Sequence, residues 1–362
     1  MTKAAELAKM GEVLTNSQLG GRRNIIINGA MQVFQRGTSF TSVSSAAFHA
    51  DRFELYLQNT ASVYTVTQDS DAPNGFANSL KLDVTTADTS TASNEEVKLF
   101  HKLEGQDLQQ FKKGTSDAEQ MTLSFYVKTN KTGVYCVELY DRDNNRDVSA
   151  SYTVSDTGWN RYVITFPADT TGAFDDDNAS SLEIQFWLIA GSAVQGGTLN
   201  ATWRSSSDPS SATGQVNFAD STDNNWAITG VQLEVGEQAT PFEHRSYGEE
   251  LALCQRYFFR YNGNVEFVGQ NYGGDTVDCP VFLPVTMRTG PSITTEDTSG
   301  NANKASVYQS AAYTHNISAA SNTGRTRNNI ILMRMTGTLS PAGTVDDCCQ
   351  VQFNDFQADS EL

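Results

Sequence analysis

The dominant pattern along the chain is a two-residue alternation of apolar and polar side chains, which is typical of β-strands with one buried face. Residues 121–128 (MTLSFYVK) and 182–189 (LEIQFWLI) show it most clearly. Clusters of turn-forming residues, such as DSDAPNG and DRDNNRD, separate these segments. Many short strands without spacers of helical length predict an all-β chain, in which antiparallel sheets stack as a sandwich.

Two segments change to a helical period. Residues 3–14 carry an apolar stripe, and near residue 246 the pair Ser246 and Glu249 fits a capping box ahead of a second helix at 247–258. The apolar residues of the two segments are Leu7, Met10, Leu14, Leu251, Cys254 and Phe258. Helices this short are unstable alone. We therefore expect them to pack on their own domain or to mediate self-association or attachment to another protein.

These periods divide the chain into four parts. Residues 1–20 form an N-terminal helical segment for attachment or oligomerisation, 21–246 a β-sandwich, 247–258 a connector helix, and 259–362 a second, smaller β-sandwich. Within the last part, residues 297–329 are rich in Ser, Asn, Thr and Ala and contain few large apolar residues. This composition predicts a long polar loop, of the kind that is commonly functional or mobile.

The net charge of the chain bears on which classes of partner it can bind. The formal net charge is −17, from 25 Lys and Arg against 42 Asp and Glu. Because nucleic-acid binding needs a basic surface, an acidic chain argues against DNA or RNA as a partner. No apolar run approaches the length of a membrane span, and the N-terminus lacks the apolar core of a signal peptide. The five cysteines show no CxxC spacing, and we expect free thiols.

Motifs of catalysis and metal binding are missing from the sequence. It contains no GxSxG elbow, phosphate-binding loop or HExxH motif, and its four histidines are scattered. Asp141, Asp143 and Asn145 begin like a calcium loop, but Arg146 and Tyr152 stand where that loop needs Gly and Glu. A polar hairpin turn fits better. We expect no enzymatic activity, no cofactor and no metal; a hydrolase with a carboxylate pair stays open, since such a pair is recognised only in space.

One strand face combines an aromatic ring with amide and carboxylate groups. Trp187 shares its face with Glu183 and Gln185, whereas Trp159 and Trp226 begin strands and are expected to be structural. The residues predicted to form a glycan-binding face are Trp187, Tyr126, Glu138, Tyr140 and Gln185. A ring beside polar groups on an open sheet suits sugar binding, because the ring stacks on the sugar and the polar groups orient it. The alternative is a face covered by a loop or a neighbouring subunit.

Several segments together resemble one family. These are 24–40 (NIIINGAMQVFQRGTSF), 50–57 (ADRFELYL), 121–130 (MTLSFYVKTN), 283–293 (LPVTMRTGPSI), 358–362 (ADSEL) and above all 228–258 (ITGVQLEVGEQATPFEHRSYGEELALCQRYF). They are similar to the tail-fibre and virion structural proteins of tailed bacteriophages, whose main domain is a jelly roll like that of carbohydrate-binding modules. The resemblance implies a jelly roll closed by the 231–235 strand, a short helix and a C-terminal β domain. It also implies a virion protein, commonly trimeric, and carries over no catalytic residues.

The hypothesis that follows is a fibre or appendage subunit of a virion, assembled in the host cytoplasm. We expect it to form a homotrimer, to attach to other virion proteins through its N-terminal segment, and to contact a glycan or protein receptor on the host surface. Two alternatives are a head-decorating fibre or tail-nozzle subunit without a receptor, and a polysaccharide-degrading spike.

We expect recognition mainly in the loops around 269–278 and 297–329, where small polar residues surround aromatic and basic anchors. The anchors are Tyr272, Tyr313, His315, Arg325 and Arg327. A disordered loop, or one that pairs with a neighbouring subunit, is the alternative.

Overall fold

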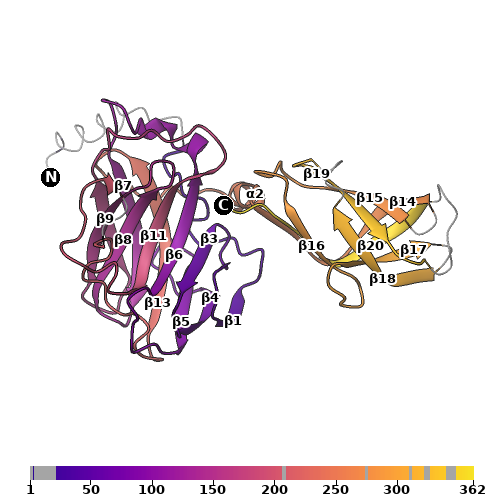
Figure 1. Ribbon diagram of the computed structural model, residues 1–362, viewed down its shortest axis with the longest axis horizontal. Helices are drawn as coiled ribbons and strands as arrows, with labels where there is room; N and C mark the ends of the chain where they lie inside the picture. The colour runs from indigo at the N-terminus through magenta and orange to yellow at the C-terminus, as the bar shows by residue number, and fades with distance from the viewer. Residues whose placement is uncertain are drawn as a thin grey trace. The chain divides into compact units, whose positions relative to one another are not determined.

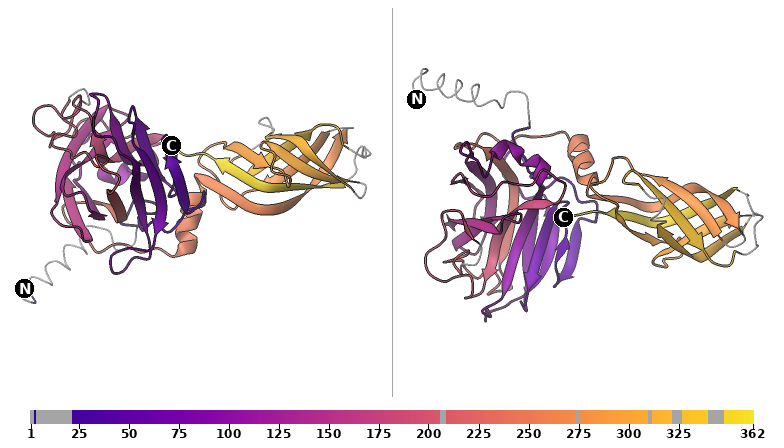
Figure 2. Two further views of the ribbon diagram at one scale, coloured as in Figure 1. Left: turned by 90° about the horizontal axis from the view of Figure 1, so that it is seen from below. Right: turned by 45° about the horizontal axis from the view of Figure 1, so that its top comes forward.

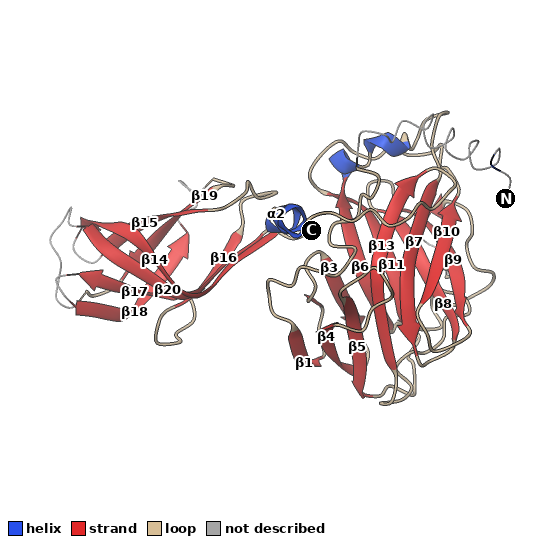
Figure 3. Cartoon of the chain, turned by 180° about the vertical axis from the view of Figure 1, so that it is seen from behind, coloured by secondary structure: helices blue, strands red, loops and turns tan. Residues whose placement is uncertain are grey.

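The computed structural model describes residues 3, 22–205, 209–273, 276–309, 312–321, 327–339 and 348–362. The chain divides into two compact units, Met1–Arg245 and Ser246–Leu362, as Figure 1 shows. The predicted N-terminal helix, with Leu7, Met10 and Leu14, lies outside the described residues except for Lys3. Strands far outnumber helices in the described chain, as Figure 3 shows, which confirms the predicted all-β class.

The first unit consists of two antiparallel sheets. In spatial order, sheet I contains β1 (Ser39–Val43), β4 (Val63–Asp69), β5 (Ser79–Thr86), β13 (Asn225–Val235), β7 (Met121–Thr129) and β10 (Asn160–Phe166). Sheet II contains β12 (Arg204–Ser205), β9 (Arg146–Val154), β8 (Gly133–Asp141), β11 (Ser180–Ala190), β6 (Glu96–Glu104), β3 (Phe53–Gln58) and β2 (Ala47–Phe48). Two short 3-10 helices, η1 (Gly105–Asp107) and η2 (Gln109–Phe111), follow β6. From β6 onward the chain passes repeatedly between the two sheets, and this confirms the predicted jelly-roll sandwich.

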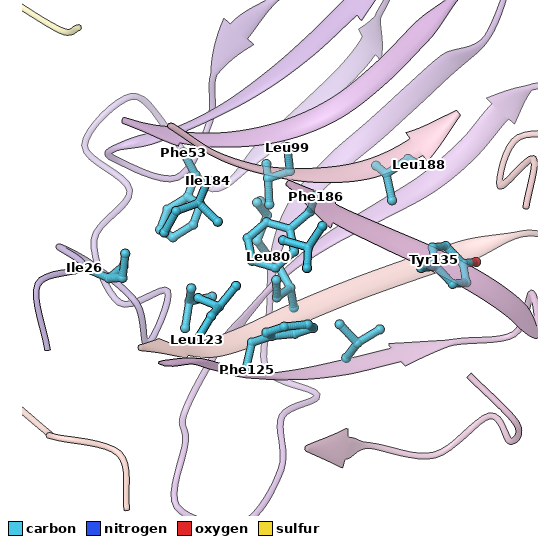
Figure 4. Packing of buried hydrophobic residues seen from close by; sticks show 14 of the residues in the cluster. Ile26, Phe53, Leu80, Leu99, Leu123, Phe125, Tyr135, Ile184, Phe186 and Leu188 are labelled. Carbon is cyan, nitrogen blue, oxygen red and sulfur yellow. The ribbon is translucent and has the colours of Figure 1, made fainter. Parts of the chain in front are cut away.

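The core of this unit lies between the sheets, and Figure 4 shows its side chains. Leu123 and Phe125 of sheet I and Ile184 and Phe186 of sheet II are all fully buried, as their alternating positions predict. The rings of Phe125 and Phe186 meet edge to face, with centroids 5.0 Å apart. Burying a side chain of this size stabilises the fold by about 1.5–3 kcal/mol, so the alternation alone goes far to fix which faces meet.

A buried lysine ties the β8–β9 hairpin to the rest of the unit. The predicted hairpin turn is confirmed, since β8 ends at Asp141 and β9 begins at Arg146. The Lys113 ammonium lies 2.5 Å from Asp141 Oδ2 and 3.0 Å from Asp169 Oδ2. It also donates to the carbonyl oxygens of residues 171 and 172. Its charge is thus fully surrounded by oxygen, which is the condition for burying it.

The second unit begins with the connector helix α2 (Tyr247–Gln255). Ser246 caps it as predicted, because its hydroxyl accepts from the Glu249 N–H. The predicted end at residue 258 is wrong. Phe258 is instead the first residue of β14 (Phe258–Gly273) and pairs with Asp359 of β20 (Cys348–Asp359).

The strands of the second unit belong to one sheet, which Figure 2 shows curling around its core. Its order is β14, β15 (Thr276–Phe282), β19 (Ile330–Thr336), β18 (Ala312–Ser321), β17 (Lys304–Gln309), β20 and β16 (Ser292–Glu296). β14 also pairs with β20 along its length, so the sheet closes and its two halves face each other across the core.

The predicted loop at 297–329 is wrong, because β17 and β18 occupy much of it. Ala305 pairs with Ile317, and both are buried, as is Val307. Ser306 between Ala305 and Val307 is buried as well, so the buried positions of β17 include two small residues and do not alternate with exposed ones. The paucity of large apolar side chains therefore hid two strands.

Candidate binding face

The outer face of sheet II carries a shallow groove across four adjacent strands. It consists of two adjoining hollows of about 320 and 240 Å³, which share Glu96, Lys98, Tyr140 and Gln185. Strand β3 contributes Glu54 and Tyr56; β6 contributes Glu96, Lys98, Phe100 and Lys102; β8 contributes Glu138 and Tyr140; β11 contributes Glu183, Gln185 and Trp187. Arg142 lies just after β8. We call this surface the sheet II groove.

Strand register brings these side chains together. One row across the sheet pairs Tyr56 with Lys98 and Lys98 with Trp187. The next row runs Glu54, Phe100, Gln185 and Glu138. Residues directly opposite each other in antiparallel strands have Cβ atoms about 4.5–5.5 Å apart. Side chains from four segments that are distant in sequence therefore form one continuous surface.

Aromatic rings form an apolar part of the groove. Tyr56 stacks on Phe100 with centroids 5.1 Å apart and planes 11° from parallel. Phe100 is nearly buried, whereas Tyr56 and Tyr140 are half-buried and keep part of their surface accessible. The Tyr140 hydroxyl donates to Asn145 Oδ1 at 2.8 Å, which fixes the orientation of that ring. Such rings offer a platform to the apolar face of a ligand ring.

Compensated charges surround the rings. Three ion pairs lie in the groove: Lys98 with Glu96 at 2.7 Å, Lys102 with Glu54 at 2.9 Å, and Arg142 with Glu183 at 2.8 Å. Gln185 joins two of the pairs, since it accepts from Lys98 and donates to Glu183. The groove thus presents fixed hydrogen-bond donors and acceptors while its charges neutralise one another.

Trp187 lies beneath this surface and is only 1% exposed. It packs with Cys136, Ala190 and Ala212, and the connection at 191–216 covers it with Val194 and Leu199. Lys98 Nζ lies 3.8 Å from its ring centroid. The expectation that Trp187 stacks on a sugar is therefore wrong, and the alternative of a face covered by a loop is confirmed for this ring.

Glu138 is buried below the groove beside Trp187. The Trp187 indole N–H donates to Glu138 Oε2 at 3.0 Å. Burial raises the pKa of this carboxyl from 4.5 to about 7, although the nearby Lys98 ammonium acts in the opposite direction. Near neutral pH the floor of the groove therefore holds a carboxyl that gains or loses a proton readily.

The structure separates Tyr126 from the other predicted glycan-binding residues. Glu138, Tyr140, Gln185 and Trp187 do lie together on sheet II. Tyr126 belongs to β7 of sheet I, where its ring contacts Phe76 at 5.4 Å between centroids. The alternation correctly places it away from the core but cannot assign it to a sheet.

The residues predicted as anchors in the loops around 269–278 and 297–329 lie in different elements. Tyr272 is in β14 and Tyr313 in β18, but their side chains are not described. Arg325 lies outside the described residues. His315 is exposed on β18 with its Nδ1 atom 2.8 Å from Ser306 Oγ, and Arg327 is exposed beside β19.

The predicted attachment surface of the connector helix is mostly internal. Leu251 is half-buried, but Cys254 and Phe258 are 0% and 1% exposed within their own chain. They are therefore wrong as contacts with other copies or proteins. None of the five cysteines forms a disulfide, and Cys348 is the one that is exposed.

Sequence reasoning missed the part of the groove formed by β3 and β6. Lys98, Phe100 and Lys102 alternate along β6 with Val97, Leu99 and Leu103 of the core, so their direction away from the core could have been read from the pattern. Their neighbours on β3 and β11 could not, since these pairings join segments far apart in the chain.

The described residues contain neither a metal-binding cluster nor a membrane-spanning helix. No group of three or more His, Cys, Asp or Glu side chains there is arranged to hold a metal ion. No helix in the described segments has both the length and the apolar character needed to cross a membrane.

Comparisons with known proteins complete the description. No protein-family model matches the sequence, and no curated protein matches it significantly. Among solved structures, it is similar to a family 11 carbohydrate-binding module from Clostridium thermocellum in complex with a β-1,3-1,4-mixed-linked tetrasaccharide, at 11% identity and a TM-score of 0.29, covering 56% of this chain and 99% of that chain. A cyclase from Fischerella sp. TAU is 12% identical with a TM-score of 0.33, covering 60% of this chain and 100% of the cyclase.

A third similar structure spans more of the chain. The CBM22-1–CBM22-2 tandem domain of Paenibacillus barcinonensis Xyn10C is 10% identical with a TM-score of 0.28, covering 95% of this chain and 99% of the tandem. These similarities are distant. We therefore base the function on the residues of the groove.

Proposed function

We propose that this chain is a non-enzymatic, glycan-binding subunit of a virion surface appendage, and that the sheet II groove binds the glycan. The observation that carries the proposal is the groove itself. It places the partly accessible rings of Tyr56 and Tyr140 between three ion pairs on an open sheet face. Glycan binding at the groove does not depend on whether the chain belongs to a virion.

A sugar chain fits this chemistry better than other ligands. Sugar rings have an apolar face that stacks on aromatic rings and an edge of hydroxyls that need donors and acceptors. The Glu54–Lys102 and Glu96–Lys98 pairs supply both kinds of group at fixed positions. Because the charges of the groove are compensated, we expect a neutral polysaccharide to bind at least as well as an anionic one.

The appendage part of the proposal rests on the sequence resemblance at 228–258 and its companion segments. It includes location on the virion, assembly in the host cytoplasm, a homotrimeric state and contact with the host surface. The absence of catalysis belongs to the proposal as well. At the groove, Glu54, Glu96 and Glu183 each form an ion pair with a cationic side chain. Glu138 is only 5% exposed and accepts from the Trp187 N–H, so each of these carboxyls already has a partner within the chain.

The test is binding of the full chain to a panel of purified bacterial O-polysaccharides and capsular polysaccharides, neutral and anionic. Tyr56→Ala and Tyr140→Ala should each weaken binding by about twofold to tenfold, since a ring contact contributes about 0.5–1.5 kcal/mol. Tyr247→Ala is the matched control, because Tyr247 is 57% exposed in the second unit. Unchanged binding by both groove variants would contradict the site, and release of reducing ends from the polysaccharide would contradict a non-enzymatic role.

A further inference from the structure

The outer face of the second unit presents large apolar side chains to solvent. Val268 on β14 is 71% exposed and Phe282 on β15 is 62% exposed, the two highest values among large apolar side chains of the described residues. Large apolar side chains that gather on one face of a soluble protein mark an interaction surface. Single exposed apolar residues are normal on soluble proteins. Val268 and Phe282 therefore mark an interaction surface only if they have apolar neighbours.

Strand pairing places both side chains on one continuous face. Pro280 pairs with Leu332 and Phe282 pairs with Ile330 across β15 and β19, and all four lie on the side away from the core. The intervening residues, such as Cys279 and Val281, are buried in the interior. We call the outward surface of β14, β15 and β19 the apolar face.

The apolar face contains a hollow as well as a projection. A depression of about 560 Å³ is lined by Val268, Pro280, Leu332 and Cys348, together with residues 269, 270 and 278. Phe282 stands two residues beyond Pro280 on the same strand face, which is about 7 Å away along the strand. A projecting ring next to an apolar hollow is complementary in shape to another copy of the same surface.

The acidic residue at the hollow is paired with a cation. Its Asp278 and Arg334 form a bidentate ion pair, with Nε–Oδ1 and Nη2–Oδ2 distances of 2.7 Å. The chain as a whole carries −17, so two copies repel each other where uncompensated acidic surfaces meet. An apolar hollow whose one acidic residue is paired is where identical acidic chains can approach.

We propose that the apolar face is a contact between copies of this chain, in which Phe282 of one copy enters the hollow between Val268 and Leu332 of another. The contact lies in the second unit, whereas the sheet II groove belongs to the first unit. Each copy in an assembly can therefore bind a glycan, which adds avidity to weak single sites.

The oligomeric state of the full chain tests the proposal. Light scattering and sedimentation of the parent at micromolar concentrations should show an oligomer. Val268→Asp and Phe282→Asp should each weaken association by at least about tenfold, because they place a charge in an apolar contact. Val163→Asp is the matched control, since Val163 is 50% exposed on β10 of the first unit, and it should associate like the parent. Far-UV circular dichroism and thermal unfolding verify that each variant folds.

The Cys348 thiol gives a second, local measurement. The other four cysteines are buried, so maleimide labelling of the folded chain reports Cys348. It should react at least about tenfold more slowly in the parent than in Val268→Asp. A monomeric parent, or an oligomer whose mass neither Asp variant changes, would overturn the proposal. A monomer with a protected Cys348 would show instead that another segment of the same chain covers this face.

Discussion

The buried carboxyl of Glu138 allows a quantitative prediction about stability. In the folded state its pKa is about 7, against 4.5 ordinarily, with burial as the main cause. Between these two values the folded chain holds a proton that the unfolded chain has released. Stability therefore falls as pH rises through this window. The 2.5-unit difference at 1.36 kcal/mol per unit corresponds to about 3 kcal/mol.

Glu138→Gln removes the ionisable group and keeps an oxygen that can accept from the Trp187 N–H. The measured quantity is the free energy of unfolding of the variant minus that of the parent. We expect this difference to be about 3 kcal/mol larger at pH 8 than at pH 4. Glu237→Gln is the control, since Glu237 is exposed and should show little change at either pH.

The assay is urea unfolding followed by tryptophan fluorescence at the two pH values. All four tryptophans lie in the first unit, so the fluorescence transition reports the unit that contains Glu138. An equal stability difference between Glu138→Gln and the parent at pH 4 and pH 8 would refute the reasoning. It would mean that the carboxyl has the same pKa in the folded and the unfolded state.

Two further substitutions test the packing of the first unit. Lys113→Met should destabilise it by about 3–5 kcal/mol in urea unfolding, because the buried Asp141 loses its cation. Gly230→Ala should cost about 1–3 kcal/mol, since a Cβ there lies 2.7 Å from the Phe76 ring at a φ of +65°. Gly236 also has a positive φ, +103°, but a Cβ there meets nothing within 4 Å. If Gly236→Ala causes a similar loss of stability, backbone strain and not the contact with Phe76 explains the effect of Gly230→Ala.

The sequence predicts the local part of the fold well, because alternation records which side of a strand is buried. The inward positions of β7 and β11 and the Ser246 cap are examples. It fails where the pattern is carried by small residues. Ala305 in β17 is fully buried, as leucine residues are in other strands. The segment around it is rich in small and polar residues, however, and this composition resembles that of a loop.

The candidate site could be predicted only in part. Alternation correctly places Glu138, Tyr140 and Gln185 away from the core. It cannot show that the connection at 191–216 folds over Trp187, or that Tyr56 of β3 reaches the same groove. Both facts depend on contacts between distant segments, which periodicity does not encode.

The location of the glycan contact is the measurement that tests the account most directly. Hydrogen–deuterium exchange of the full chain, with and without the tightest-binding polysaccharide of the panel, reports which strands the ligand protects. We predict slower exchange in the segments of β3, β6, β8 and β11 that line the sheet II groove, and unchanged exchange in β17 and β18. Slower exchange in β17 and β18 with unchanged exchange in the groove would contradict the account. It would place recognition in the second unit of the chain.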